Sequence, residues 1–495
     1  AGRDQALKSP LKVLQVAAEL APLLSTGGLA EVVNALPKAL HDQGHDVRVA
    51  LPCYRSIPES LRGKRIGACE AKLGPKRLGG TLRETRIPGT DIPVYLVEHP
   101  GYFGREHPYG HEGGEYGDNA ERYCFFGLGL LDGLSRIGWK PDVINCHDWH
   151  TAPIVIFLKT RLANDPVWAG TPAVYTIHNL NFQGRFAADQ LPFTGFDPAL
   201  FRMECLEYFG DINLMKGAIV LADKLSTVSP RYAREIQTLE YGAGLDGVLR
   251  TRSDDLRGIL NGIDYEVWNP ARDPHIAAAF DHDDLGGKSL CKRDLQEAFH
   301  LPRRDAPLFG VVSRLTWQKG IDLIIDAAEN LLDVDFQIAL LGTGDAQIEN
   351  RLIAAAQRRP GKVAVILRYD TAIAHKLFAG SDFFLMPSRY EPCGLSQLYS
   401  LAYGTVPIVR RTGGLADSVR NLSRVNGRGA KPTGLSFVPM TSQALLRAMH
   451  KAFDVYRAPK TLAALRVAGM EEDFSWARAS RDYVALYREA LAQAG

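Results

Sequence analysis

Two cations in the second half of the chain have the side-chain types and the spacing to hold an anion. Arg314 and Lys319 stand five positions apart, between the β-rich run 308–312 and a helical pattern that opens at Gly320. A planar guanidinium and a compact ammonium on one strand-to-helix turn can reach the same phosphate. A departing diphosphate is the group that they would neutralise. Two solvated surface cations are the alternative.

One acidic residue has a backbone setting that favours a functional role. Glu391 precedes Pro392, which biases it toward an extended conformation, and Gly394 lies in the turn before the next helical pattern. We therefore expect the Glu391 carboxylate at the site, with a structural cap or turn acid as the alternative. Cys393 lies beside it, but the motif holds no histidine that could activate a thiol, so buried filler is the favoured interpretation of Cys393.

In the first half of the chain, polar residues follow two β-rich runs. His147, Asp148 and His150 come after one run, and His178 comes after the next. These residue types occur at metal sites, yet a third fixed ligand is missing and adjacent residues at a strand end tend to point apart. Sugar hydroxyls bonded to Asp148, with His178 nearby, are the favoured interpretation. Strand-end polar groups satisfied within the protein are the alternative.

A glycine pattern occurs once in each half. The hexapeptide TGGLAE at 26–31 is echoed by TGGLAD at 412–417, and each opens a helical pattern. Two glycines before a helix let backbone N–H groups approach a ligand closely, and the positive end of the helix dipole suits phosphate. A tight turn would explain one such loop equally well, but a pair is harder to dismiss.

The elements that must position these residues follow from the periodicity. Short β-rich runs alternate with amphipathic stretches from end to end, which predicts an α/β protein with two doubly wound parallel sheets. In such sheets ligands bind beyond the carboxyl ends of the strands, where the residues above, Asn261 and the 342–344 turn all stand. We therefore expect polar groups from both halves to meet at one cleft. The runs are 13–16, 47–51, 94–97, 143–146, 173–177, 225–228, 308–312, 336–341, 363–367, 383–386 and 406–409.

The domain junction is expected where this alternation is interrupted. The stretch 264–307 carries four prolines and a charged run, with no convincing strand, and the run at 308–312 then restarts a sheet. We expect an N-terminal Rossmann-like domain over 1–263, an interdomain region over 264–305 and a C-terminal Rossmann-like domain over 306–472. The last helical stretch, 473–495, is expected to cross back to the N-terminal domain.

Composition narrows the class of protein. A length of 495 residues exceeds one domain, and 58 Lys and Arg against 56 Asp and Glu leave a net charge of +2, so neither a nucleic acid nor a membrane surface is an expected partner. Seven scattered cysteines without a C-x-x-C pair favour a reducing cytosol. No apolar run reaches the length of a membrane span. The 342–344 turn lacks the third glycine of the dinucleotide fingerprint and no Walker A sequence occurs, which disfavours NAD enzymes and P-loop ATPases.

Several motifs, taken in order, resemble those of the bacterial glycogen synthase and plant starch synthase family. The most specific are R-L-x-x-Q-K-G and E-P-C-G-L-x-Q-L-Y, and the resemblance covers essentially the whole chain. It implies the GT-B architecture, in which two Rossmann-like domains face a deep cleft, with the acceptor on the N-terminal side and the nucleotide sugar on the C-terminal side. The segments that carry it are 25–33, 147–150, 176–179, 261–264, 313–320, 391–395 and 410–417.

The resemblance implies an activity. A member of this family is a retaining, metal-independent, cytoplasmic glucosyltransferase that needs no cofactor. It moves glucose from ADP-glucose to the 4-hydroxyl at the non-reducing end of an α-1,4-glucan such as glycogen. Because no nucleophile is evident, retention favours front-face attack within an ion pair.

The resemblance also implies residue roles. Arg314 and Lys319 match the cations that stabilise the departing diphosphate, and Glu391 matches the acid near the donor glucose. Asp148 and His178 match residues that contact glucose. Tyr399 stands where related transferases have a second glutamate and this family has tyrosine. The substrate contacts so implied are Ser25, Gly27, Gly28, Asn261, Gly344, Cys393, Gly394, Leu395, Tyr399, Thr412, Gly413 and Gly414.

One departure from the family pattern affects the donor. The N-terminal loop of the family begins Lys-Thr-Gly-Gly-Leu, and here Ser25 replaces the lysine. We expect weaker donor binding or an altered donor preference, with activity retained through Arg314 and Lys319. The alternatives are a UDP-glucose-dependent synthase, a weakly active or inactive glucan-binding or initiating homologue, and a glucan phosphorylase, although no motif indicates pyridoxal phosphate. The tyrosine-rich stretch 102–123 is expected to help hold the acceptor or to cover the cleft, with a disordered surface loop as the alternative.

Overall fold

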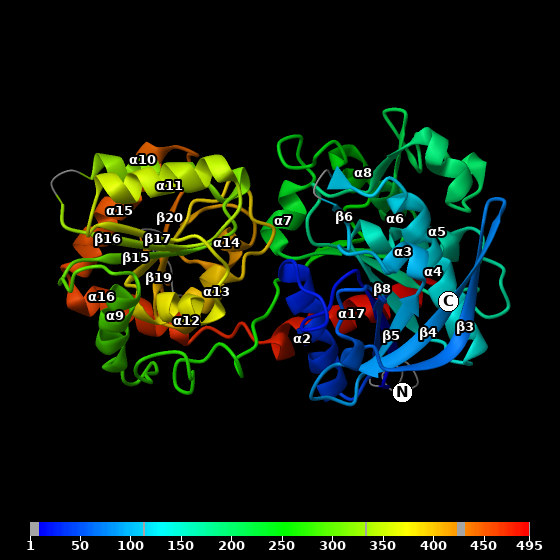
Figure 1. The fold of residues 1–495 in the computed structure, drawn as a ribbon, viewed down its shortest axis with the longest axis horizontal. Helices are drawn as coiled ribbons and strands as arrows, with labels where there is room; N and C mark the ends of the chain where they lie inside the picture. The colour runs from blue at the N-terminus through cyan, green and yellow to red at the C-terminus, as the bar shows by residue number, and fades with distance from the viewer. Residues whose placement is uncertain (1–8, 112–113, 332–333, 423–430, 495) are drawn as a thin grey trace. The chain divides into compact units, whose positions relative to one another are not determined.

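The structure is a computed structural model that describes residues 9–111, 114–331, 334–422 and 431–494 (Figure 1). Its contacts divide the chain into two compact units. The first holds Ala1–Val228, Ala233–Ile259 and Trp476–Gly495, and the second holds Ser229–Tyr232 and Leu260–Ser475. No helix of the described chain is both long and apolar enough to cross a membrane.

The first unit is built on a nine-stranded sheet in the order β14-β13-β9-β8-β1-β2-β5-β4-β3. All six runs predicted in this half form strands of the sheet, and the six pair in parallel. The antiparallel β3–β4 hairpin has no predicted counterpart, because its strands are largely polar and half-exposed rather than apolar runs. The strands are β1 (Lys12–Val16), β2 (Asp46–Pro52), β3 (Lys64–Leu73), β4 (Lys76–Arg86), β5 (Pro93–Glu98), β8 (Val143–His147), β9 (Ala173–Ile177), β13 (Lys224–Thr227) and β14 (Leu256–Gly258).

Helices from both ends of the chain cover this sheet. The C-terminal helix α17 (Trp476–Ala494) packs against α2 (Gly28–Asp42), as Figure 1 shows, and buries Trp476, Tyr483 and Tyr487. The other helices in this half are α3 (Pro100–Phe103), α4 (Asn119–Arg136), α5 (Ala152–Lys159), α6 (Leu214–Leu221), α7 (Pro230–Glu235) and α8 (Asp246–Thr251). Short elements are β6 (Gly110–His111), β7 (Gly114–Glu115), β10 (Arg185–Ala187), β11 (Glu207–Tyr208), β12 (Asp211–Asn213), η1 (Glu59–Leu61), η2 (Trp149–Thr151), η3 (Ala188–Phe193) and η4 (Pro198–Leu200).

The second unit has a six-stranded parallel sheet in the order β17-β16-β15-β18-β19-β20. The five runs predicted in this half form β15 to β19, which confirms the predicted fold class of two Rossmann-like domains. The strands are β15 (Leu308–Val312), β16 (Gln337–Leu341), β17 (Val363–Ile366), β18 (Phe383–Met386), β19 (Val406–Arg410) and β20 (Leu435–Phe437).

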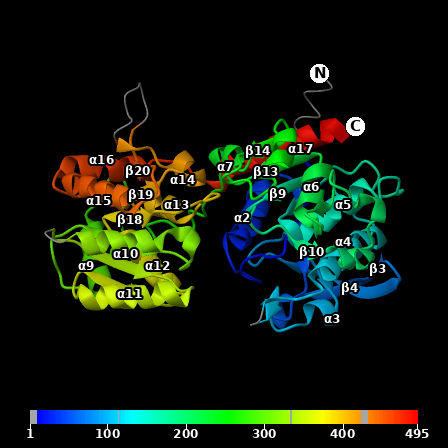
Figure 2. The same cartoon turned by 90° about the horizontal axis from the view of Figure 1, so that it is seen from above.

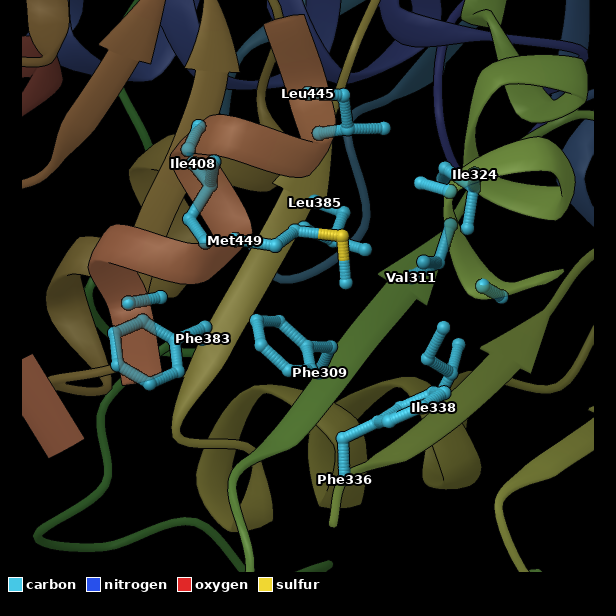
Figure 3. Close-up of a cluster of buried hydrophobic side chains, with 14 of the residues drawn as sticks. Phe309, Val311, Ile324, Phe336, Ile338, Phe383, Leu385, Ile408, Leu445 and Met449 are labelled. Carbon is cyan, nitrogen blue, oxygen red and sulfur yellow. The ribbon is translucent and has the colours of Figure 1, made fainter. Parts of the chain in front are cut away.

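Helices lie on both faces of this second sheet (Figures 1 and 2). On one face, Phe309, Ile338 and Leu385 from the strands pack with Ile324 of α10 and Met449 of α15, as Figure 3 shows. Each of these side chains is almost completely buried. Their burial stabilises the packing of the helices on the sheet that carries the loops described below. The helices are α9 (Gly287–Ala298), α10 (Ile321–Asn330), α11 (Ala346–Arg358), α12 (Thr371–Gly380), α13 (Ser396–Ala402), α14 (Gly413–Ser418), α15 (Ser442–Tyr456) and α16 (Pro459–Met470), with η5 (Trp317–Lys319).

The segment predicted as an interdomain region, 264–305, falls within the second unit. Its helix α9 packs against α12, and Cys291 and Leu295 of α9 lie in a core with Leu377. The sequence hides this role because α9 is mostly polar and only one face is apolar. The segment with these prolines and charges therefore packs within the second unit.

Candidate active site

Three loops of the second unit meet at the carboxyl edge of its sheet. They follow the neighbouring strands β15, β18 and β19. The backbone N–H of Arg389 donates to the Gln318 carbonyl at 2.8 Å, which joins the first two loops. A Cβ at Gly320 would lie 2.2 Å from the Pro387 carbonyl oxygen, so this close approach requires glycine there, where φ is +67°. The predicted residues on these loops therefore share one small region.

Lys319 and Glu391 form a buried ion pair in that region. The Lys319 ammonium donates to both carboxylate oxygens of Glu391, at 2.9 and 2.8 Å, and the Ser388 hydroxyl donates to one of them at 2.9 Å. The two side chains are 17% and 6% exposed. A buried charge without a partner costs several kcal/mol, so each of these side chains holds the other in place. One N–H of the ammonium remains for a ligand.

The glycine loop of this unit supports Glu391 from behind. A Cβ at Gly413 would lie 1.8 Å from the Glu391 carbonyl oxygen, and one at Gly414 would lie 2.0 Å from the Cys393 carbonyl oxygen. The Gly414 N–H donates to the Glu391 carbonyl at 3.1 Å. These glycines are therefore needed for contact with the Glu391–Cys393 backbone, a reason that sequence reasoning did not supply. Thr412 is the N-cap of α14.

Arg314 lies on the same loop as Lys319 but differs in its surroundings. Its side chain is exposed and makes no hydrogen bond or ion pair with any residue in the described part of the chain. The 342–344 turn packs beside it, since Leu315 N–H donates to the Thr343 carbonyl at 2.9 Å and a Cβ at Gly344 would lie 2.5 Å from the Leu315 carbonyl oxygen. The Gly344 N–H is already bonded to Glu349.

The other residues of the second unit that were predicted to contact substrate lie in different surroundings. Asn261 lies near Cys393, because its backbone N–H bonds the thiol, and its side-chain oxygen is buried with no hydrogen-bond partner in the described chain. Burial raises the pKa of Cys393 to about 12, so the thiol stays protonated and is no nucleophile. Gly394 and Leu395 directly precede α13, and Leu395 is its N-cap. The Tyr399 ring instead stacks on Trp268 at 3.9 Å, within a core of the second unit.

Asp148 of the first unit occupies a strained position at the end of β8. Its φ is +57°, which is rare for a residue other than glycine, and its carboxylate accepts the His178 N–H at 2.8 Å. A backbone hydrogen bond from Asn179 also reaches it. Burial raises the pKa of Asp148 to about 7 despite these bonds. Backbone strain and a perturbed carboxyl group together are typical of functional sites.

His178 is bonded to a second histidine of the first unit. Its Nε2 lies 2.8 Å from Nδ1 of His147. Burial lowers the pKa of His178 to about 3 and lowers that of His147 well below its usual range. Both rings are therefore neutral near pH 7. His147 uses its two ring nitrogens within the protein, at His178 and at Gln15, so of this pair it is His178 that has a nitrogen left to bond a hydroxyl. No group of three or more His, Cys, Asp or Glu side chains in the described chain is arranged to hold a metal ion.

The glycine loop of the first unit is tied to the tyrosine-rich stretch. Glu19 accepts the Thr26 N–H at 2.7 Å and the Tyr109 hydroxyl at 2.6 Å. Gly27 is the N-cap of α2, and a Cβ there would meet nothing within 4 Å, so space is open beside it. Ser25 is exposed. The stretch 102–123 packs as part of the unit in its described residues, while 112 and 113 lie outside them.

Comparisons with known proteins identify the chain. Residues 12–251 match the family described as the starch synthase catalytic domain, and residues 292–464 match glycosyl transferases group 1. The glycogen synthase of Geotalea daltonii is 44% identical over 98% of this chain and 100% of its own length. Glycogen synthase 2 of Geobacter sulfurreducens is 46% identical over 97% and 99%. The chain belongs to the glycogen synthase and starch synthase family.

A solved structure of the family supports the architecture. The catalytic domain of starch synthase IV from Arabidopsis thaliana, bound to ADP and acarbose, is 33% identical and has a TM-score of 0.89 over 98% of this chain and 100% of that one. The chain is therefore a glycosyltransferase with the GT-B fold of the glycogen and starch synthases. The predicted family, fold class and enzyme class are confirmed.

Two residues of interest for this family member escaped sequence reasoning. Tyr369 follows β17 at the carboxyl edge of the second sheet, and its ring is 86% exposed. Its only sequence signal is an aromatic residue in a polar turn after a β-rich run. Glu19 gives no signal at all, since its partner Tyr109 stands 90 positions further along the chain.

Proposed function

We propose that the chain transfers glucose, with retention, from ADP-glucose to the 4-hydroxyl at the non-reducing end of an α-1,4-glucan and releases ADP. One observation carries the proposal most: a buried Lys319–Glu391 pair beside the uncompensated cation Arg314, at the edge of a parallel sheet where ligands bind. Family membership supplies the reaction class.

The leaving group is stabilised by the two cations. As the bond from the anomeric carbon to the phosphate oxygen breaks, negative charge builds on the diphosphate. Arg314 offers a guanidinium that no residue in the described chain engages, and Lys319 offers its remaining N–H. Donors that are already in position when charge develops lower the barrier, by about 2.7–4 kcal/mol for each well-placed donor.

Glu391 acts in two ways in this proposal. It fixes the Lys319 ammonium toward the phosphate, and its carboxylate lies near the sugar, where positive charge develops on the anomeric carbon. The Ser388 hydroxyl and the Gly413-Gly414 loop hold its side chain and backbone in place. The acceptor hydroxyl then attacks the face that the diphosphate leaves, and its proton passes to the departing phosphate oxygen.

The first unit supplies sugar contacts. The backbone N–H of His178 donates to the Asp148 carboxylate, so the two residues lie together. A carboxylate accepts hydrogen bonds from hydroxyl groups, and a neutral imidazole can accept one more through its unprotonated nitrogen. We assign the hydroxyls of the transferred glucose to them, and the described part of the 102–123 stretch, through Tyr109 and Glu19, to the acceptor side.

The pH profile should report the ionisation of Asp148. Since its pKa is raised to about 7, the carboxylate is charged above that pH and loses its charge below it. We expect kcat/KM to rise about tenfold between pH 6 and pH 8. His178, with a pKa of about 3, should not contribute in this window. In Asp148→Asn the residual rate should be low and flat across this range, and an unchanged acid limb in that variant would contradict the assignment.

ADP-glucose is the proposed donor, and UDP-glucose is the alternative. The exposed Tyr369 ring at the carboxyl edge offers a face on which a base can stack. Initial rates with labelled ADP-glucose and UDP-glucose, with glycogen as acceptor, test the proposal. Polymer-bound label that appears faster with ADP-glucose supports it. Label from neither donor would favour an inactive homologue, and phosphate-dependent release of glucose 1-phosphate would favour a phosphorylase.

Ser25 should limit donor affinity. Its side chain is exposed beside the open space at Gly27, so a lysine there would reach solvent or a bound phosphate without a clash. We expect Ser25→Lys to lower the KM for ADP-glucose about fivefold, as one partly screened contact between an ammonium and a phosphate would give. Ser25→Gln, of similar length but uncharged, is the control. Equal KM and turnover in all three proteins would show that this position does not affect the donor.

We also place the enzyme in the cytoplasm. All seven cysteines lie in the described chain, and each is buried and unpaired. Seven cysteines without a disulfide are typical of a protein from a reducing compartment. The partners in this proposal are the nucleotide sugar and the glucan, with no nucleic acid and no membrane.

A further inference from the structure

A chain of buried hydrogen bonds links the C-terminal helix to His178. It runs from Tyr487 of α17 to Gln15 of β1, then to His147 and His178. On its other side the Tyr487 hydroxyl contacts Asn145 of β8. We propose that Tyr487 is a positioning residue that fixes the tautomer of His178, so that the ring presents an unprotonated Nδ1 to the substrate. The role of that nitrogen rests on the proposed function of His178.

The distances of this relay are short throughout. Gln15 Nε2 lies 2.8 Å from the Tyr487 hydroxyl, and that hydroxyl lies 2.7 Å from Asn145 Oδ1. Gln15 Oε1 lies 2.7 Å from His147 Nε2, and His147 Nδ1 lies 2.8 Å from His178 Nε2. Gln15, Asn145, His147 and Tyr487 are each 0% exposed. Water cannot replace a lost partner easily here, so each bond constrains the next.

A backbone carbonyl sets the direction of the relay. The side-chain nitrogen of Asn145 lies 3.3 Å from the Val174 carbonyl oxygen and 2.7 Å from the Thr176 hydroxyl. A carbonyl oxygen only accepts hydrogen bonds, so the amide group of Asn145 must turn its NH₂ toward Val174 and its oxygen toward Tyr487. The Tyr487 hydroxyl must then donate to Asn145, which leaves its lone pair to accept from Gln15.

The same logic carries through to His178. Because Gln15 donates to Tyr487 through Nε2, its Oε1 faces His147 and accepts a hydrogen bond from the N–H at His147 Nε2. His147 Nδ1 is then unprotonated and accepts from His178 Nε2. A neutral imidazole with its proton on Nε2 has a lone pair on Nδ1. His178 therefore offers Nδ1 as an acceptor, suited to a sugar hydroxyl that donates.

Loss of the Tyr487 hydroxyl removes this constraint. In Tyr487→Phe, neither orientation of the Gln15 amide has a partner on the α17 side, so the amide can rotate and donate to His147 instead. His147 would then keep its proton on Nδ1 and donate a hydrogen bond from it to an unprotonated His178 Nε2, which leaves the proton of His178 on Nδ1. The substrate hydroxyl would meet a donor in place of an acceptor.

The test measures the tautomer directly in the full-length protein. Histidine labelled with ¹⁵N distinguishes a protonated from an unprotonated ring nitrogen at pH 7.5, and His178→Gln assigns the signal. We expect wild-type His178 to be protonated on Nε2, and Tyr487→Phe to show a substantial population protonated on Nδ1. Tyr483→Phe is the matched control, because Tyr483 is equally buried one turn away on α17 and lies outside the relay.

Kinetics provide the second readout. We expect Tyr487→Phe to lower kcat about tenfold, the effect of one misdirected hydrogen bond, while Tyr483→Phe stays near wild type. A wild-type His178 protonated on Nδ1 would overturn the proposal without any variant, as would an unchanged tautomer in Tyr487→Phe. If the tautomer shifts as expected but neither protein elongates glycogen, the relay stands and the proposed function fails.

Discussion

Lys319→Ala is expected to lower kcat about 10³-fold, because it removes one of the two cations that we propose to stabilise the departing diphosphate. The same change leaves the Glu391 carboxylate, 6% exposed, with the Ser388 hydroxyl as its one side-chain partner among the described residues. Removing one side of a buried pair costs about 3–5 kcal/mol of stability, so the melting temperature should also fall. Elongation of glycogen from labelled ADP-glucose and a thermal unfolding curve measure the two effects.

A matched variant separates catalysis from stability. Lys376 of α12 pairs with Asp294 of α9 at 3.0 Å in the second unit. The two side chains are 28% and 29% exposed. Lys376→Ala should lower the melting temperature slightly and leave kcat unchanged at a temperature where the protein is folded. If Lys319→Ala elongates glycogen as fast as Lys376→Ala does, Lys319 has no role in the reaction.

Glu391→Gln should separate the two roles given to that carboxylate. We expect kcat to fall about 10²–10³-fold, since the negative charge near the anomeric carbon is lost. ADP should bind at least as tightly as to wild type, because the Lys319 ammonium no longer shares its charge with Glu391. Calorimetry with ADP and single-turnover rates measure these quantities.

The double variant sharpens this prediction. Lys319 and Glu391 are in direct contact, so their effects on stability should not add. Lys319→Ala combined with Glu391→Gln should be more stable than Lys319→Ala alone, because no buried charge is left unpaired.

Weaker ADP binding in Glu391→Gln, with kcat unaffected, would mean that Glu391 only holds the lysine.

Most strands of the two large sheets could be predicted from the sequence, but few of the side-chain contacts at the site could. Apolar β-rich runs mark every strand that is buried on both faces, such as β15 and β18, because burial demands that composition. The polar β3–β4 hairpin has no such mark. Arg314 and Lys319 could be predicted as site residues because they follow β15, and ligands bind at the carboxyl ends of such strands.

Contacts between distant residues could not be predicted. Lys319 and Glu391 stand 72 positions apart, and nothing in either motif indicates that the two side chains bond each other. Periodicity likewise could not predict the hydrogen bond between Gln15 and Tyr487, which stand 472 positions apart. The Tyr399 ring stacks on Trp268, a residue of a segment whose prolines conceal that it packs in the second unit.

In the proposed reaction, Arg314 and Lys319 bind the diphosphate while glucose leaves it. A crystal structure of this protein with ADP tests it most directly. We predict that the guanidinium and the ammonium both lie within hydrogen-bond distance of oxygens on the terminal phosphate, with Lys319 still bonded to Glu391. Side chains that point into solvent, away from well-ordered ADP, would contradict the account.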